Sequence, residues 1–320
     1  MEIFSMKKIK KPSKPLSISE RIITGLASTK EQKIVDLVSM KNARVRGEEL
    51  MDSIVSNEKL SRLDPLHAAY AYGQNMLSVF VEQLTELPEL SELAGLYADA
   101  EDEYMPSGPP MSPLTRSYFT CWGCFDLCAG AKKETFGTIA IDICKALGAD
   151  AKLIRIFEKM QASRMGFYVH EGFSGRHVLL RELINGKRLE AVAPSGHRGQ
   201  PGEIWLARIM PDPFEEVRLG YWLVFTTPYV IGKVAGGYFN LIGDALGWEA
   251  FFNRALENTG EPDKVAAYEK LMKSGLDRHY WNEYIFEAYV SHTNEAVWLT
   301  GFPDIPLSRP HSRESQRNLK

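Results

Sequence analysis

Three cysteines between residues 121 and 128 form the densest group of potential metal ligands in this chain. The segment reads Cys-Trp-Gly-Cys-Phe-Asp-Leu-Cys, and Cys144 is the remaining cysteine. Thiolates are the ligands of zinc and iron–sulfur sites, so Cys121, Cys124 and Cys128 are candidates for metal binding or redox chemistry. The spacing, however, places all three on one face of a predicted helix, where free cysteine packs as a small apolar residue. Because no histidine is close in sequence as a fourth ligand, we favour packing and expect no cofactor.

The loop over residues 194–203 combines side chains that could act as nucleophile, base and anion binder. It reads Pro-Ser-Gly-His-Arg-Gly-Gln-Pro-Gly-Glu. Ser195 and His197 are only two positions apart, which disfavours a direct nucleophile–base pair, and the loop lacks a G-x-S-x-G elbow. A hydrolase or transferase would therefore need a nearby histidine, for which His170 and His177 are the candidates. Two other interpretations stay open: contact with a ligand or partner, and a wide strand connection that needs glycine dihedrals.

Aromatic and basic residues are interleaved along the segments on either side of this loop. Such a mixture suits nucleic acid, because aromatic rings stack on bases while basic side chains contact phosphates. The same alternation is also what the two faces of a small barrel require. The residues concerned are Phe167, Tyr168, Phe173, Arg176, Arg181, Arg188, Trp205 and Arg208. The candidate binding residues that we select are Arg176, Arg181, His197, Arg198, Glu203 and Arg208.

Five short runs rich in branched and aromatic residues, separated by turn residues, must position these side chains. They cover residues 166–171, 177–183, 188–193, 203–210 and 221–231. Asn185-Gly186 falls between the second and third runs and is a strong signal for a two-residue hairpin. The alternate positions predicted to face inward are Tyr168, Val178, Leu180, Trp205, Ala207, Ile209, Trp222 and Val224. We therefore expect a central five-stranded antiparallel meander or small barrel over residues 165–232, OB-like or SH3-like.

The sequence on either side of these strands follows helical periodicity and carries capping signals. Ser17 and Glu20 are spaced as a capping box, and Asp64 precedes Pro65 as an N-cap. Further helices are expected at about residues 113–129 and 133–147, the second ended by Gly148 in a left-handed conformation. The predicted class is α+β and mostly helical, with helical regions at 17–164 and 233–302. Residues 1–16, which are basic, and residues 303–320 are expected to be disordered tails.

Composition limits the class of protein. The chain has 320 residues, of which 44% are apolar, enough for a sizeable core. Its net charge of −3 argues against attraction of nucleic acid or anionic lipid by the whole surface, so such binding would need a local patch. No apolar run reaches the length of a membrane span, so we expect no membrane partner. The few clustered cysteines agree with a reducing compartment, and we expect a cytoplasmic protein.

Three segments of the barrel region loosely resemble a region of uncharacterised bacterial proteins, some of which carry a zinc-binding SEC-C tail. Residues 163–169 match an aromatic strand, and Leu180 to Gly186 is similar to a hairpin of the form LxDLLTG. Residues 202–208 are similar to a strand of the form GDxxxAR. The resemblance covers about a fifth of the chain, and no cysteine follows Cys144, so the zinc tail has no counterpart. It implies a structural role for these motifs and no particular activity.

These observations favour a non-catalytic binding or regulatory module in the cytoplasm. Its barrel and the loop at 194–203 would be presented to a macromolecular partner, either nucleic acid or protein. One alternative is a hydrolase or transferase that uses this loop with a nearby histidine. The other is a metalloprotein with its site at the cysteine cluster.

Overall fold

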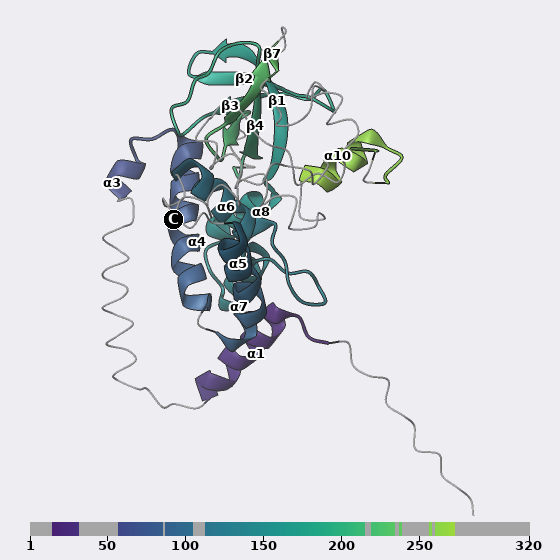
Figure 1. The fold of residues 1–320 in the computed structure, drawn as a ribbon. Coiled ribbons are helices and arrows are strands. Elements are labelled where there is room, and N and C mark those ends of the chain that lie inside the picture. Colours follow the sequence, from purple (N-terminus) through teal and green to yellow (C-terminus); the bar gives the residue numbers. More distant parts are fainter. Residues whose placement is uncertain are drawn as a thin grey trace, which may run out of the picture.

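The computed structural model describes residues 15–31, 57–85, 87–104, 113–214, 219–233, 237–238, 256–257 and 260–272. In these residues a group of helices lies beneath a small barrel, which confirms an α+β fold that contains a barrel (Figure 1). The expectations for the two tails, for residues 32–56 and for the chain after residue 272 lie outside the described residues, apart from Pro15 and Leu16.

The helices follow the capping signals of the sequence closely. Asp64 Oδ1 accepts the Leu66 N–H at 2.9 Å, and Pro65 occupies the first position of the long helix. Gly148, at φ 70°, ends another helix in the left-handed conformation. The described helices are α1 (Ile18–Glu31), α3 (Asn57–Leu60), α4 (Pro65–Thr85), η1 (Pro88–Leu90), α5 (Ser91–Tyr104), α6 (Pro113–Phe125), α7 (Phe136–Leu147), α8 (Ala151–Ala162) and α10 (Lys264–Met272).

Helix α6 is shorter than the sequence predicted. It ends at Phe125, where the N–H groups of Asp126 and Leu127 both bond to the Trp122 carbonyl at 2.9 Å. The chain then turns, and Ala129 pairs with Glu134 in an isolated β-bridge. The prediction that three cysteines share a helical face is therefore wrong for the third, because Cys128 follows the helix.

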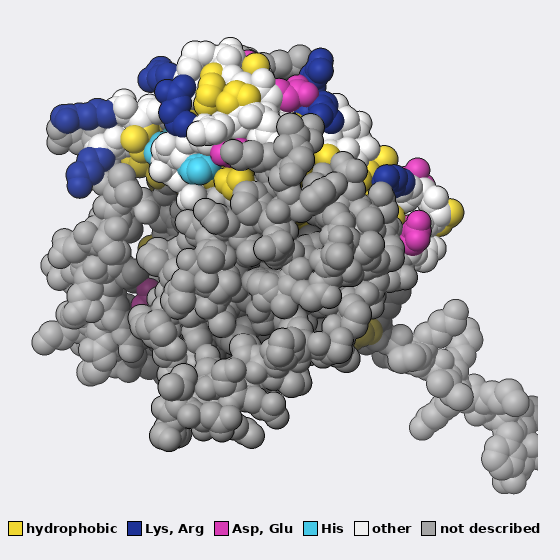
Figure 2. Space-filling view, turned by 45° about the horizontal axis from the view of Figure 1, so that its top comes forward, with side chains coloured by type: hydrophobic (Ala, Val, Ile, Leu, Met, Phe, Trp, Pro, Cys, Tyr) yellow, Lys and Arg dark blue, Asp and Glu magenta, His cyan; other side chains and the backbone are white. Residues whose placement is uncertain are grey.

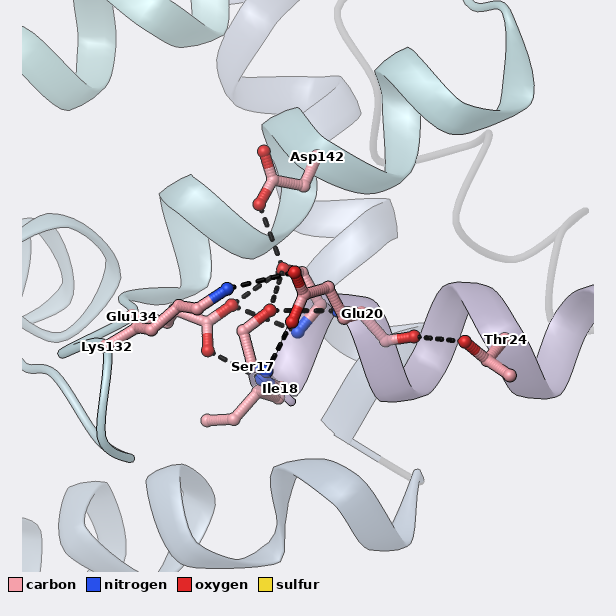
Figure 3. A network of polar contacts seen from close by, with 8 residues as sticks. Ser17, Ile18, Glu20, Thr24, Lys132, Glu134 and Asp142 are labelled. Carbon is pink, nitrogen blue, oxygen red and sulfur yellow. Dashed lines mark hydrogen bonds and ion pairs between the residues drawn. The ribbon is translucent and has the colours of Figure 1, made fainter. Parts of the chain in front are cut away.

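Helix α1 is joined to this turn by a buried carboxylate (Figure 3). Glu134 accepts the backbone N–H groups of Ile18 and Ser19 at 2.6 and 3.0 Å, and the Ser19 hydroxyl lies 2.7 Å from the same carboxylate. Ser17 and Glu20 form the predicted capping box, with reciprocal hydrogen bonds of 2.7 and 3.1 Å. A negative group at a helix N-terminus meets the unpaired N–H groups there, so Glu134 fixes where α1 begins and where it packs.

The strands form a closed barrel with one parallel pair. The strand order β1-β2-β3-β5-β4 closes by pairing of β1 with β4, and β3 and β5 run parallel. The predicted antiparallel arrangement is therefore wrong for this pair, because the chain crosses over between β3 and β5. The strands are β1 (Arg164–Ser174), β2 (His177–Glu182), β3 (Arg188–Val192), β4 (Glu203–Met210), β5 (Trp222–Val224), β6 (Tyr229–Lys233) and β7 (Gly237–Tyr238).

Two local predictions within the barrel need correction. The run at 221–231 is split, because β5 pairs with the end of β4 and with β3, whereas β6 pairs with the beginning of β4. The hairpin between β2 and β3 is present, but its connection is longer than two residues. Glu182 N–H bonds to the Lys187 carbonyl at 2.8 Å, and Gly186 has φ 69° inside the turn.

The barrel interior is filled as the alternation of the sequence predicted. All the residues expected to face inward belong to one buried cluster, except Trp222, which is half-buried against it. The cluster consists of Tyr168, Val178, Leu180, Leu189, Ala191, Trp205, Ala207, Ile209 and Val224. These aromatic rings are therefore core residues and do not lie on a binding surface.

Within the described residues, other elements cover the outer side of the barrel on β1, β4 and β5 but not on β2 and β3. Every residue of β4 is buried, since its outward side chains pack against the helices. Leu206 belongs to a cluster with α6 and α7, whereas Met210 and Leu223 belong to a second cluster with α4 and α8. Helix α10 contacts β1. The outward residues of β2 and most of β3 are half-buried or exposed, and no described helix covers them.

Candidate functional site

The uncovered outer surface of β2 and β3, with the turns beside it, forms the face where charge and exposure coincide. We call it the open face and define it by Glu171, Phe173, Arg176, Arg181, Lys187, Arg188, Glu190 and Arg198. Five of these side chains are basic and two are acidic. Figure 2 shows Lys and Arg side chains spread around the barrel end, with hydrophobic and histidine side chains between them.

The centre of the open face is a cross-strand ion-pair group. Arg181 on β2 lies opposite Arg188 on β3. Glu171, from β1, accepts from Arg181 Nε at 2.6 Å and lies 3.1 Å from Arg188 Nε. The side chain of Arg188 is nevertheless 77% exposed, so its guanidinium also faces solvent. One carboxylate thus neutralises only part of the charge of two arginines, and the centre of the face stays positive.

One edge of the open face is anchored to the helices through Tyr221. The Tyr221 hydroxyl donates to the Asp64 carboxylate at 2.9–3.0 Å, and the His177 ring packs on the Tyr221 ring at 4.3 Å. His177 Nδ1 lies 2.7 Å from Glu190 Oε1. Burial and Asp64 together raise the pKa of Tyr221 to about 12, so this phenol keeps its proton. The His177 ring is therefore held by Glu190 and Tyr221.

The loop at 194–203 is fastened to β1 by His170, which is completely buried. His170 Nδ1 accepts the Gly172 N–H at 3.1 Å, so the ring proton lies on Nε2, which donates to the Arg198 carbonyl at 3.0 Å. The His170 carbonyl also accepts the Gly202 N–H at 2.8 Å. Burial lowers the pKa of His170 below its usual 6.5, which agrees with this neutral tautomer. Both ring nitrogens are thus used to hold the backbone.

The remaining polar residues of the loop do not form a catalytic group in the described part of the chain. Ser195 is exposed, and its hydroxyl accepts the His197 N–H at 3.3 Å. Glu203 is buried and accepts the Trp205 indole N–H at 2.9 Å. The His197 ring packs 5.3 Å from Trp205, and its buried Nε2 has no hydrogen-bond partner among the described residues. Glu203 and His197 therefore support the barrel end.

Arg208 lies inside the protein, although the sequence made it a candidate for the binding surface. Its side chain is 1% exposed and forms a bidentate pair with Asp126, with N–O distances of 2.6 and 3.1 Å. Its Nε donates to the Ser163 hydroxyl at 2.8 Å. Burial by itself would lower the pKa of Arg208, because it disfavours the charged guanidinium. The charge and hydrogen bonds of Asp126 have the larger effect, so the pKa of Arg208 is raised. Arg208 therefore joins the barrel to α6 and cannot contact phosphate.

The cysteines lie close to this buried pair. Burial raises the pKa of Cys121 to about 11 and that of Cys124 to about 12, so both are thiols at neutral pH. Cys128 is half-buried in the turn after α6, and Cys144 is buried in α7. Within the described residues, no group of three or more His, Cys, Asp or Glu side chains is placed to hold a metal ion.

Five members of the open face were not selected from the sequence as binding candidates: Glu171, Phe173, Lys187, Arg188 and Glu190. Alternation places Arg181 and Arg188 on the same outward side of a hairpin, so their proximity could have been inferred from the turn at Asn185. Lys187 follows that turn, and its ammonium lies 4.2 Å from the centre of the Trp222 ring. The pairing of Glu171 with both arginines follows from the hairpins β1–β2 and β2–β3 and from the bulge between His170 and Gly172, and no local signal in the sequence indicated that bulge.

No described helix is long and apolar enough to cross a lipid bilayer. Comparison of this chain with protein-family models, curated proteins and solved structures finds no match.

Proposed function

We propose that this protein is a non-catalytic, cytoplasmic binding module whose open face binds single-stranded nucleic acid. The observation that carries the proposal is the charge of the open face, with five basic and two acidic side chains on the barrel surface that the described helices leave uncovered. The chain as a whole has a net charge of −3, so this local excess is not a consequence of composition. A phosphate backbone is the polyanion that such a surface would attract.

The topology supports an OB-like barrel more than an SH3-like one. A parallel β3–β5 pair within the order β1-β2-β3-β5-β4 gives a Greek-key barrel, which is the OB arrangement. OB barrels bind oligonucleotides on the face of strands 2 and 3, beside the loops at its edges. Here that same face is the one that the described helices leave uncovered. We therefore assign the open face, and not the filled barrel interior, as the contact surface.

The enzyme and metal alternatives have less support from the geometry. Both nitrogens of His170 are engaged with backbone groups, so it is not available as a base for Ser195. Among the described residues, no further His, Cys, Asp or Glu side chains join Cys121 and Cys124 in a group that could hold a metal ion.

The test is a titration of labelled homopolymers, dT and rU, of about 20 nucleotides by fluorescence anisotropy. For a single strand, log K falls with log salt by about 0.7 per phosphate neutralised, so three to five contacts predict a slope of about −2 to −3.5. We expect binding at about 50 mM salt that weakens with this slope. Absence of binding at low salt would overturn the proposal and leave a protein as the partner to seek.

A matched pair of variants locates the surface. The triple variant R176E/K187E/R188E reverses three exposed charges on the open face, whereas R21E/K152E/K264E reverses three exposed charges on α1, α8 and α10. The net charge changes equally in both. We expect the first variant to lose more than tenfold in affinity at about 50 mM salt, and to bind with a shallower salt slope. Equal losses in the two variants would mean that the open face is not the site.

A further inference from the structure

Phe173 is an apolar ring exposed at the end of the open face. It is 38% exposed, the largest value for an aromatic side chain among the described residues of the barrel. The other large aromatic rings of β1, Phe167 and Tyr168, are buried on the two sides of that strand. An exposed ring in an otherwise filled barrel gains free energy if a flat apolar partner covers it.

The backbone that carries Phe173 is held in place by His170. The register of β1 against β2 shifts between His170 and Gly172, and Gly172 has φ 130°, a conformation that favours glycine. The Gly172 N–H bonds to His170 Nδ1, and the His170 ring lies 4.8 Å from the Phe173 ring. A β-bulge of this kind redirects the following side chain. The position of Phe173 is therefore organised before any ligand binds.

Arg198 is held against the same ring from the other loop. Its guanidinium carbon lies 4.7 Å from the centre of the Phe173 ring, and its carbonyl accepts from His170 Nε2 at 3.0 Å. One buried histidine thus positions both the strand that carries Phe173 and the loop that carries Arg198. Arg176 follows in the β1–β2 turn and adds a further exposed positive charge nearby.

We infer that Phe173 and Arg198 form a stacking subsite for one nucleobase of the bound single strand, an inference that rests on the proposed function. Aromatic rings and guanidinium planes both stack on bases, and the guanidinium can also contact the adjoining phosphate. Stacking uses the flat face that every base has, so the subsite accepts any base. The arginine pair of the hairpin then contacts the phosphates that follow along the open face.

The experiment compares a dT oligonucleotide with an abasic chain of equal length, which keeps the phosphates but has no bases. Stacking of one base strengthens binding by about 5- to 150-fold. We expect the wild-type protein to bind dT more tightly than the abasic chain by a factor in this range. F173A is expected to reduce the ratio of the affinities for dT and for the abasic chain at least fivefold and to leave the salt slope unchanged. F173W is expected to keep the wild-type ratio. The control is Y72A, which removes an aromatic ring of equal exposure, 38%, from α4. This variant is expected to leave the ratio of the two affinities unchanged.

The outcomes separate this inference from the proposed function. Equal, salt-dependent binding of dT and the abasic chain would refute the stacking subsite and leave the phosphate surface intact. A loss of affinity in F173A that is the same for both chains, or failure of F173W to retain the preference for dT, would also refute the subsite. Failure of the wild-type protein to bind either chain would remove the proposed function itself.

Discussion

Arg208 shows that arginines on the outer side of different strands of one barrel can have opposite roles. Its outward direction on β4 leads into the helices and not into solvent, where Asp126 and Ser163 satisfy its guanidinium. A buried ion pair offers little net stability compared with apolar residues, but removal of one partner leaves an uncompensated charge. The pair therefore specifies how the barrel sits on α6.

We predict that D126A lowers the free energy of unfolding by about 3–5 kcal/mol, measured by urea denaturation, because Arg208 is left buried and unpaired. The double variant R208M/D126L recovers most of this loss, since no charge then remains inside. The control is E158Q, which breaks the exposed pair of Glu158 with Lys145. It is expected to cost less than about 1 kcal/mol. A double variant as unstable as D126A would contradict this role.

His170 connects stability to pH. Burial lowers its pKa below 6.5 in the folded protein, so the unfolded chain takes up a proton first as pH falls. The contribution of neutral His170 is complete above pH 6.5 and is lost as pH falls from there through the folded-state pKa. The proton would enter at Nδ1 and break the bond from Gly172.

We predict that the wild-type protein loses more stability between pH 7.5 and pH 5 than H170F, which cannot titrate. The difference is at most about 1.4 kcal/mol per pH unit. Urea midpoints at a series of pH values measure it. His67 also has a lowered pKa, but it is present in both proteins. Its contribution to the pH dependence of stability therefore cancels when the two proteins are compared. Parallel pH curves for the two proteins would show that His170 does not carry the effect.

At the scale of elements, local signals and long-range contacts contribute differently to the helices. Helix α7 begins with Thr135 and Thr138 in a capping box and ends at Gly148, all within one segment. Helix α1 has its own capping box, yet its position depends on Glu134, which follows it by more than a hundred residues. Helix α10 is placed by Tyr268, whose hydroxyl accepts the Phe167 N–H of β1 at 2.9 Å.

We predict that E134Q loosens α1, because an amide NH₂ would face backbone N–H donors at the helix start (Figure 3). A buried donor that loses its acceptor costs about 1–3 kcal/mol. Hydrogen exchange of the α1 amides is expected to accelerate accordingly, while exchange in the barrel stays unchanged. The control D142N alters an exposed carboxylate that contacts the Ser19 hydroxyl and has a smaller effect. Equal acceleration in the two variants would exclude a special role of Glu134.

For the whole molecule, the barrel and the helices share their cores. Met165, Phe167 and Leu206 pack in one cluster with residues of α6 and α7, and Leu223 packs in another with residues of α4 and α8. The barrel therefore has an apolar outer side on three strands. Its own interior is a separate but smaller cluster.

We predict that a fragment covering residues 163–233 does not fold as an independent unit, because its outer apolar side would be exposed to water. The full chain is expected to unfold with a cooperative transition that includes the barrel. Amide NMR dispersion and dye binding by the fragment, compared with the full chain, provide the measurement. A dispersed spectrum with cooperative melting of the fragment would show that the barrel is autonomous.

Much of the barrel could be predicted because its signals are local. The period-two alternation identified the interior residues, and the turn residues placed the ends of β2, β3 and β4 within about one residue. The open face was predicted only in part. Arg176, Arg181 and Arg198 lie on it, whereas Arg208 is buried, because alternation shows that a side chain points outward but not what covers that side.

The sequence by itself determined the α+β class, the capped ends of the helices and the interior of the barrel, since each depends on neighbours within a few residues. Tertiary structure alone decided the parallel β3–β5 closure, the pairing of Arg208 with a residue 82 positions away, and the bulge that sets Phe173 opposite Val178 at the barrel end. These features arise from contacts between distant segments. Barrel closure and helix packing determine which outward residues are buried. They therefore determine which arginines form buried ion pairs and which are exposed to solvent.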